Sequence, residues 1–334
     1  MKKIIVYCIS AGISLCCGNL IANESVEVKW QADVSSSVQF LAHSRSNIGN
    51  LGIGVQDAIM RTEIKDSKSS PLKIMLGIGV LEYISYEGTI APFSPIDIGL
   101  HYGWLEYQLS PRWQWQMGQL ENQAGFENGV STKNSHIQFG GINHSRSFYY
   151  PGTRALYSSG AVQFYAEISG PEIPNDTGTG LGVKYDYGSG MLAGNVTQYL
   201  DEESVYYNFN WEQRVSRLTL GGVLDYIQLN KAPAWRDDQA LALAGYLKLQ
   251  FRKRYLALRG EYFDAGNSGV YGYEEAGVIT LTYGYDITPT AFMRFEGMYA
   301  KSSNNIFQDS KVPVNDQYGI AMQIGVRFGK RHSL

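Results

Sequence analysis

The last regular segment of the chain reads Tyr318-Gly319-Ile320-Ala321-Met322-Gln323-Ile324-Gly325-Val326-Arg327-Phe328. Large apolar or aromatic side chains occupy every second position, and small or polar residues occupy the positions between them. This period of two predicts a β-strand with two different faces. One face suits lipid and the other suits a water-filled lumen. The alternative is a half-buried strand of a soluble β-sandwich, so the rest of the chain must distinguish the two.

The N-terminal segment has the order of a secretory signal peptide. Lys2 and Lys3 precede an apolar run over residues 4–15, and a cleavage site follows Ala22. We therefore expect a signal peptide at 1–22 and a mature chain at 23–334. All the cysteines lie within the signal peptide, at positions 8, 16 and 17, so the mature chain can form neither a disulfide nor a Cys-ligated metal site.

The mature chain, about 310 residues long, is rich in tyrosine and glycine, and no later apolar run approaches the roughly 18 residues that a membrane helix needs. Alternating segments recur instead, with no convincing helix between them. We expect strands at residues 28–40, 51–64, 72–80, 96–104, 113–117, 154–158, 161–168, 181–187, 191–199, 205–212, 218–229, 240–251, 255–264, 276–286, 291–300 and 318–328. This gives about 16 strands, or 14 without the short sixth and the irregular second. Asp57 interrupts the apolar face of the second strand and predicts a bulge or a shorter strand.

Long and short connections alternate along the chain. Long ones are expected at 42–50, 85–95, 121–152, 169–180, 230–239, 265–275 and 301–317, and short ones at 110–112, 159–160, 188–190, 213–216, 252–254 and 287–290. The connections 65–71 and 201–204 fit the alternation less well. An antiparallel up-and-down transmembrane β-barrel predicts this alternation, with short periplasmic turns and long external loops, whereas a Greek-key sandwich does not. The expected location is the outer membrane of a Gram-negative bacterium.

The longest connection, 121–152, contains charges of both signs. At this length it is more than a turn, and we expect it to fold into the lumen and constrict it. Opposite charges across a constriction would select solutes by size and charge. The candidate residues in or beside this connection are Glu121, Glu127, Lys133, Arg146 and Arg154. The alternative is a surface loop outside the mouth of the barrel.

Charged residues also recur on the polar faces of the predicted strands. Such residues need either water or tight ion pairing, and a barrel of about 16 strands can hold an aqueous channel. The candidates for the pore wall are Asp97, Arg259, Glu261, Arg294, Glu296 and Arg327. The alternative is a structural ladder of ion pairs in a plugged barrel. A slight excess of inward acids favours cations over anions.

Several short motifs resemble the OmpL-like β-barrel porin family. They are Trp115-Gln116-Met117-Gly118-Gln119-Leu120, Gly125-Phe126-Glu127, Asn143-His144-Ser145-Arg146-Ser147, Gly152-Thr153-Arg154-Ala155, Thr280-Leu281-Thr282-Tyr283 and Met293-Arg294-Phe295-Glu296. The chain departs from the family pattern at Gln119, at His144 and in the order of Gly125 and Phe126. The resemblance implies an outer-membrane porin, which would not be an enzyme.

The hypothesis from the sequence is a water-filled channel for passive diffusion of small hydrophilic solutes or ions, without a cofactor or metal. Partners expected besides the solutes are outer-membrane lipid and lipopolysaccharide, the barrel-assembly machinery through the C-terminal strand, and two further copies in a homotrimer. A mild acidic excess, 31 acidic against 26 basic residues once Lys2 and Lys3 are removed, does not favour nucleic acid.

Two other functions are alternatives. A closed barrel could act as an adhesin or structural protein through loops 230–239 and 301–317. A lipid hydrolase would use Ser145 or Ser147 as nucleophile and His144 as base, but the chain lacks the compact signature of outer-membrane phospholipases.

Overall fold

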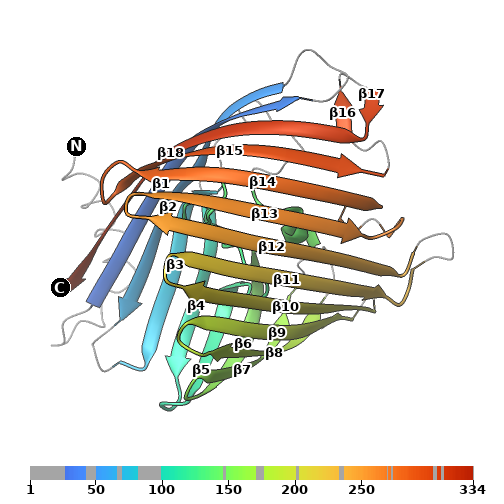
Figure 1. Ribbon diagram of the computed structural model, residues 1–334. Coiled ribbons are helices and arrows are strands. Elements are labelled where there is room, and N and C mark those ends of the chain that lie inside the picture. Colours follow the sequence, from blue (N-terminus) through green and yellow to red (C-terminus); the bar gives the residue numbers. More distant parts are fainter. Residues whose placement is uncertain are drawn as a thin grey trace.

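The computed structural model places the described residues in a closed barrel of 16 antiparallel strands (Figure 1). The described residues are 27–42, 50–65, 70–81, 99–145, 148–170, 177–200, 203–232, 237–268, 270–271, 274–303, 307–309 and 312–333. The barrel consists of β1 (Glu27–Ala42), β2 (Asn50–Lys65), β3 (Leu72–Leu81), β4 (Gly99–Gln108), β5 (Trp113–Glu121), β6 (Tyr149–Ser159), β7 (Val162–Ser169), β8 (Gly178–Asp186), β9 (Gly190–Tyr199), β10 (Ser204–Val215), β11 (Leu218–Leu229), β12 (Gln239–Phe251), β13 (Arg254–Asp264), β14 (Glu275–Asp286), β15 (Ala291–Ser302) and β18 (Asp316–Ser333). The predicted all-β barrel of about 16 strands is confirmed.

The first and last strands close the barrel. They pair along their whole length, from Glu27 opposite Ser333 to Ala42 opposite Tyr318. Every other strand pairs with its neighbours in the sequence, apart from β15, which pairs with β18. The connections after the even-numbered strands β2 to β14, such as 252–253 between β12 and β13, lie at the end of the barrel where β1 starts and β18 finishes, whereas the four-residue connection between β9 and β10 lies at the opposite end. We call this end the short-turn rim and the opposite end the long-loop rim.

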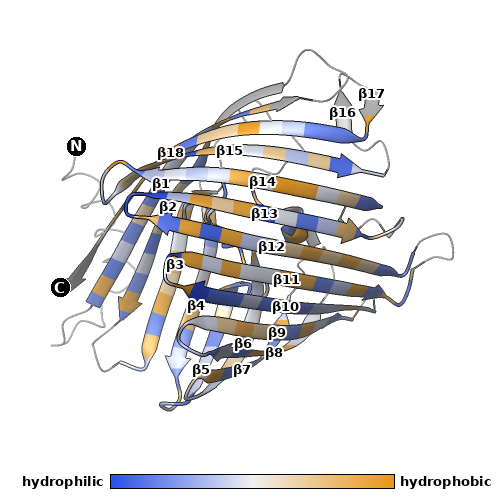
Figure 2. Ribbon diagram, viewed as in Figure 1, coloured by the Kyte–Doolittle hydropathy of each residue, from blue (hydrophilic) through white to orange (hydrophobic). Residues whose placement is uncertain are grey.

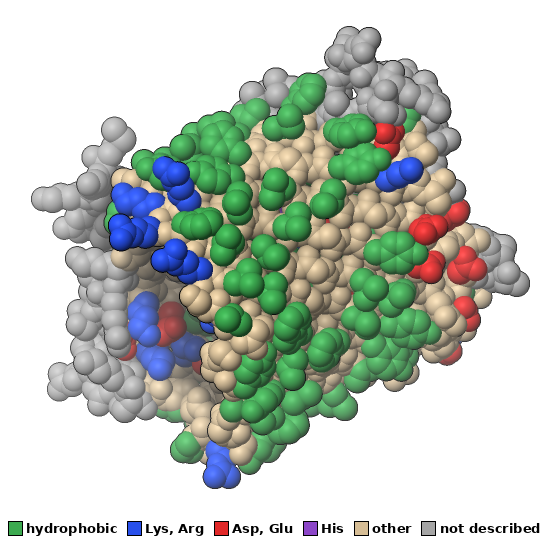
Figure 3. All heavy atoms as spheres, viewed as in Figure 1, with side chains coloured by type: hydrophobic (Ala, Val, Ile, Leu, Met, Phe, Trp, Pro, Cys, Tyr) green, Lys and Arg blue, Asp and Glu red, His purple; other side chains and the backbone are tan. Residues whose placement is uncertain are grey.

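The outward face of the barrel is a belt of exposed apolar side chains. Leu100 is 60% exposed and Ile320 is 66% exposed, although both lie within strands. The hydropathy alternates along the strands in Figure 2, and hydrophobic side chains cover the outer wall in Figure 3. Such a belt is typical of a surface that faces lipid. Within the described ranges, no helix has the length and apolar character to cross a membrane.

Local differences from the sequence prediction have physical reasons. The bulge predicted in the second strand is confirmed: Ser35 pairs with Asp57 while Ser36 pairs with Val55, so Gln56 is the extra residue. Beyond the bulge the Asp57 side chain faces inward. The sixth strand starts at Tyr149, earlier than expected, because Tyr149 pairs with the end of β5. The start of the predicted strand 96–104, including Asp97, lies outside the described residues.

Two features of the long-loop half were not predicted. Connection 301–317 contains a small hairpin of β16 (Phe307–Asp309) and β17 (Val312–Val314). The inward face of β11 to β15 near the long-loop rim is also apolar rather than polar. It forms a buried cluster that includes Val223, Phe263, Val278 and Met298, and the cluster extends to loop residues Ile142, Tyr271 and Val314. This part of the barrel interior is therefore a packed hydrophobic core.

Candidate functional site: the loop inside the barrel

The connection between β5 and β6 forms hydrogen bonds with inward-facing side chains of strands on the far side of the barrel. Its described part, 122–145 with 148, carries two short 3₁₀ turns, η1 (Ser131–Lys133) and η2 (Gly141–Ser145). We call residues 122–148 the inner loop. Its partners on the wall belong to β1, β2, β13, β14, β15 and β18, and they hold the loop in three places.

The first anchor joins η1 to the strands that close the barrel. The Asp57 carboxylate accepts hydrogen bonds from the backbone N–H of Ser131 at 3.1 Å, from the Ser131 hydroxyl, and from the hydroxyl of Ser35 at 2.8 Å. The hydroxyl of Thr132 donates to Asp33 at 3.1 Å, and the Gln323 amide donates to the Ser131 hydroxyl at 2.9 Å. These groups are buried, so each bond replaces one that water would otherwise supply.

The second anchor uses two charged side chains of β15. The Arg294 guanidinium donates to the carbonyls of Ser131 at 3.1 Å and Thr132 at 2.9 Å. Two residues further along, the Glu296 carboxylate accepts from the backbone N–H groups of Ile137 at 2.7 Å and Gln138 at 3.0 Å. Arginine therefore satisfies loop carbonyls and glutamate satisfies loop amides, and bonds to charged groups are stronger than neutral ones.

The third anchor is a charged triad. Arg259 of β13 binds Glu127 of the loop, with 2.7 Å between Nη1 and Oε1, and Glu261 of its own strand, with 2.9 Å between Nε and Oε2. Glu127 also accepts from the Gly140 N–H at 2.8 Å and the Asn143 amide at 2.6 Å. Both glutamates are buried beside the arginine. Removing one charged member of the triad would leave a buried charge without compensation.

A buried histidine lies between the second and third anchors. His136 Nδ1 is 2.7 Å from the hydroxyl of Thr282, which donates to Glu296 at 2.6 Å. Because that hydroxyl proton goes to Glu296, the oxygen of Thr282 accepts the N–H of His136. Burial lowers the pKa of His136 below its ordinary value, since a charged imidazole loses its hydration inside the barrel. The docked loop therefore holds this histidine neutral.

The structure brings five of the residues predicted to line a constriction together at the anchors: Glu127, Arg259, Glu261, Arg294 and Glu296. The other predicted residues lie elsewhere. Arg154 is buried on β6 and pairs with Glu167 at 2.7 Å, Lys133 is exposed, and Arg327 lies on β18. Asp97 and Arg146 are outside the described residues, as are the side chains of His144, Ser145 and Ser147 on which the hydrolase alternative depends.

Several anchor residues were not among the predicted site residues, and the sequence pattern pointed to one of them. Asp57 interrupts an apolar strand, which marks an inward carboxylate that needs a partner. Asp33, Thr282 and Gln323 were unremarkable, because polar residues on an inward face are common in a wide barrel. The partners Ser131 and Thr132 had no signal at all.

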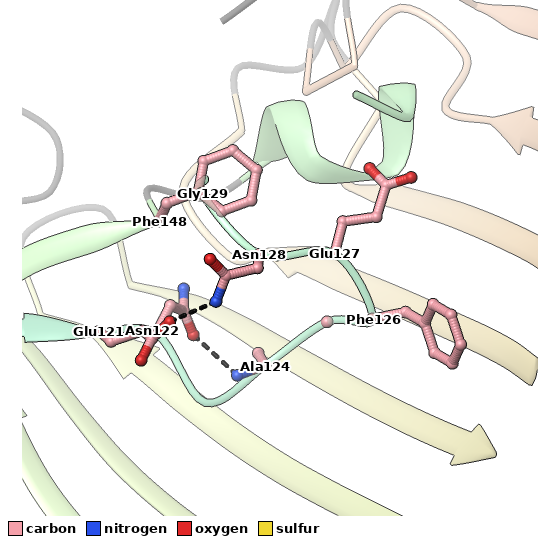
Figure 4. Close-up of a pocket in the computed structure, with 9 residues that line it drawn as sticks. Glu121, Asn122, Ala124, Phe126, Glu127, Asn128, Gly129 and Phe148 are labelled. Carbon is pink, nitrogen blue, oxygen red and sulfur yellow. Dashed lines mark hydrogen bonds between the residues drawn. The ribbon is translucent and has the colours of Figure 1, made fainter. Parts of the chain in front are cut away.

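A small hollow lies where the inner loop leaves β5. It measures about 160 Å³ and is lined by Glu121, Asn122, Ala124, Gly125, Phe126, Glu127, Asn128, Gly129 and Phe148 (Figure 4). The Asn128 amide donates to Glu121 at 2.5 Å, and the side chain of Glu127 points away from this pair. Among the described residues, no three His, Cys, Asp or Glu side chains come together to hold a metal ion.

A closed barrel with an apolar exterior and a loop anchored inside it is an architecture of outer-membrane barrels. The chain belongs to the family described as "Putative beta-barrel porin-2, OmpL-like", whose model matches residues 98–328. The resemblance noted in the sequence is thereby confirmed. No curated protein matches the chain.

Solved structures with a similar fold include outer-membrane proteins. Outer-membrane expressed OmpT of Vibrio cholerae has a TM-score of 0.64 at 10% identity, covering 92% of this chain and 99% of that one. A trimer form of in-vitro folded OmpT from Vibrio cholerae has a TM-score of 0.58 at 11% identity, covering 91% and 100%. OccK11 of Pseudomonas aeruginosa has a TM-score of 0.53 at 10% identity, covering 92% and 98%. At such identities the likeness concerns the fold alone.

Proposed function

We propose that this protein is an outer-membrane porin, a channel for passive diffusion of small hydrophilic solutes, with the short-turn rim in the periplasm and the long-loop rim outside the cell. The family and the barrel fold support a porin-type role. To this role the proposal adds an open path through the lumen. The exposure of inward-facing side chains indicates where in the lumen this path lies.

The exposure differs between the two sides of the barrel. On the side that holds the inner loop, inward polar residues such as Ser37, Gln39 and Thr280 are no more than 1% exposed. On β5 to β9, inward polar residues such as Gln116 and Asn195 remain partly exposed. The loop thus covers one wall and leaves part of the opposite wall exposed. This difference carries the proposal, because a solute needs one wetted wall and a packed plug would cover both.

In this role the anchors hold the loop to one side and keep the path open, while side chains between them and the wetted wall set its width. Glu121, which is partly exposed at the start of the loop, borders this side. No covalent chemistry is required.

Single-channel recording tests the proposal. The mature protein is refolded from detergent into a planar bilayer and recorded in potassium chloride. Stable conductance steps are expected, and a reversal potential in a salt gradient would give the charge preference. Absence of steps from protein shown to be folded and inserted would overturn the proposal and direct attention to the long-loop rim as a binding surface. Chemical cross-linking in native membranes would show whether three copies associate.

A further inference from the structure

Most charged side chains on the inward face of the barrel are paired. The ion pairs on the wall are Lys29 with Glu63, Arg61 with Asp33, Lys73 with Glu106, Arg154 with Glu167, Arg214 with Glu212, and Arg259 with Glu261. Lys248 on β12 and Arg327 on β18 also face inward, but within the described residues neither forms an ion pair. A cation inside a barrel without a carboxylate partner raises the local positive potential.

Aromatic rings hold these two cations in place. Lys248 Nζ lies 4.4 Å from the ring centroid of Tyr255, and the guanidinium carbon of Arg327 lies 4.5 Å from that of Phe292. Arg294 lies over the same Phe292 ring at 4.7 Å. A ring face orients a cation without neutralising it. The charges of Lys248 and Arg327 therefore remain available to a ligand, and Arg294, whose terminal nitrogens bond to the loop, adds a third positive charge behind them.

The same cluster lies directly beside the inner loop. Arg294 uses its terminal nitrogens on the loop carbonyls described above, and the Tyr255 hydroxyl donates to the Ser135 carbonyl at 2.9 Å. Arg327 lies further toward the short-turn rim, and its Nε has no hydrogen-bond acceptor. The loop thus fixes one edge of the cluster and leaves Arg327 facing the other way.

Nearby acids do not cancel this positive charge. Arg294 and Arg327 both lie close enough to Lys248 to repel its positive charge. Asp286 attracts the positive charges of both Lys248 and Arg327. Asp286 is exposed at the end of β14. Asp33 also attracts Arg327, and Glu212 attracts Lys248. Each of these acids already has its own partner, because Asp33 pairs with Arg61 and Glu212 pairs with Arg214. Glu296, two residues from Arg294 on β15, is a second acid without a cation partner among the described residues, because its bonds are to loop amides and to Thr282. Three cations against these two acids still leave a positive surplus at this place.

A cavity adjoins the cluster on the short-turn side of the loop. It measures about 550 Å³, and Arg327 lines it together with Lys29, Arg61 and Glu63, whereas Lys248 and Arg294 do not. A space of this size admits a small organic ion. Figure 3 shows that the short-turn rim, at the left of the view, also gathers basic side chains, while acidic ones gather at the long-loop rim.

We propose that Lys248, Arg294 and Arg327, backed by Phe292 and Tyr255, form a binding site for small anions that carry a carboxylate or phosphate group. The planar guanidinium of Arg327 offers N–H donors that fit both groups, Lys248 adds a point charge, and Arg294 contributes through its charge. As a station for a permeating solute the site rests on the proposed porin function, whereas binding itself does not. The site reverses the cation preference expected from the sequence, because the inward acids are largely taken up by ion pairs and loop anchors.

The test is equilibrium binding of inorganic phosphate to the refolded mature protein in detergent at low salt, measured by calorimetry. The double variant K248Q/R327Q should bind at least about tenfold more weakly, since each cation contributes a charge-assisted bond. Arg294 is left intact because it holds the loop. The matched control is K184Q, which removes an exposed inward lysine from β8 and should leave the affinity unchanged. Equal affinity in the wild type and the double variant, or an equal loss in K184Q, would overturn the site.

Recording in planar bilayers separates this proposal from the porin proposal. Channels that conduct but show the same anion preference with and without K248Q/R327Q overturn the anion site and leave the porin standing. Phosphate binding that depends on both cations in a protein without conductance overturns the porin and leaves the anion site standing.

Discussion

Glu127 and Arg259 form a buried ion pair, with 2.7 Å between Oε1 and Nη1, although 132 residues separate them in the sequence. The pair joins the inner loop to β13 at a place where neither side chain reaches solvent. It is therefore a structural anchor, and substituting either residue tests whether the position of the loop sets the properties of the proposed channel.

Breaking this pair from either side should loosen the loop by different amounts. In Glu127→Gln the arginine keeps Glu261 as partner, so we expect a loss of about 1–3 kcal/mol in stability. In Arg259→Met two carboxylates lose their cation, so the loss should be larger, about 3–5 kcal/mol. Denaturant unfolding in detergent measures both. The control Glu203→Gln removes an exposed pair with Lys231 and should cost less than about 1 kcal/mol. Equal losses in the three variants would contradict the anchor.

Gly140 lies in the loop where no side chain fits. A Cβ atom there would be 2.6 Å from Glu261 Oε1, an oxygen already bound to the Ile142 N–H at 3.2 Å. Gly140→Ala should therefore displace the loop, at a cost of about 1–3 kcal/mol for overpacking. Gly260→Ala is the matched control, because a Cβ at Gly260 meets nothing within 4 Å. Protease cleavage of the inner loop should increase in the first variant and stay constant in the second.

Acidification should weaken the docking of the inner loop through His136. Burial lowers the pKa of His136 in the docked state, so the undocked state binds more protons as the pH falls. The docked state should be fully stable above pH about 6.5 and should lose stability progressively below it. Hydrogen exchange of loop amides at pH 7.5 and pH 5 measures this loss. His136→Gln should reduce the pH dependence, and an unchanged dependence would assign it to another group.

The apolar outer belt gives a prediction that separates a lipid-facing surface from an ordinary exposed one. Leu281, in the middle of β14, is 54% exposed. Leu281→Arg should destabilise the barrel in lipid vesicles by about 2–4 kcal/mol, because the bilayer midplane has no water to solvate the charge. Leu109→Arg, at the short-turn rim, should cost at most about 1 kcal/mol. Urea unfolding from vesicles compares the two, and a neutral Leu281→Arg would argue against lipid at this position.

The barrel could be predicted from the sequence because its signals are local. The alternation from Tyr318 to Phe328 reproduces the two faces of β18, and the alternation of connection lengths reproduces the two rims. Asp57 even located the bulge. Each of these depends on the period of a single strand or on the distance to the next one.

The anchors of the loop could not be predicted, because they join residues far apart in the sequence. Glu296 binds the Ile137 amide across 159 residues, and Arg294 binds the Ser131 carbonyl across 163. The pattern placed both side chains inward, but it could not say whether water or the loop would meet them. The apolar inner wall of β11 to β15 was missed for a related reason, since Ala242 and Val278 resemble strand residues whether they face lipid or a core.

The seam between β1 and β18 has a consequence for how the protein is made. The side-chain amide nitrogen of Gln323, on the last strand, lies within hydrogen-bonding distance of acceptors on Ser35 of the first strand, Gln56 of the second and Ser131 of the loop. The loop emerges from the ribosome long before Gln323 exists, and loop closure over 288 residues is slow. The hydrogen bonds among these groups can therefore form only after the C-terminal strand has paired with β1, and a chain that lacks this strand would leave the buried groups of Ser131 and Gln56 without these partners.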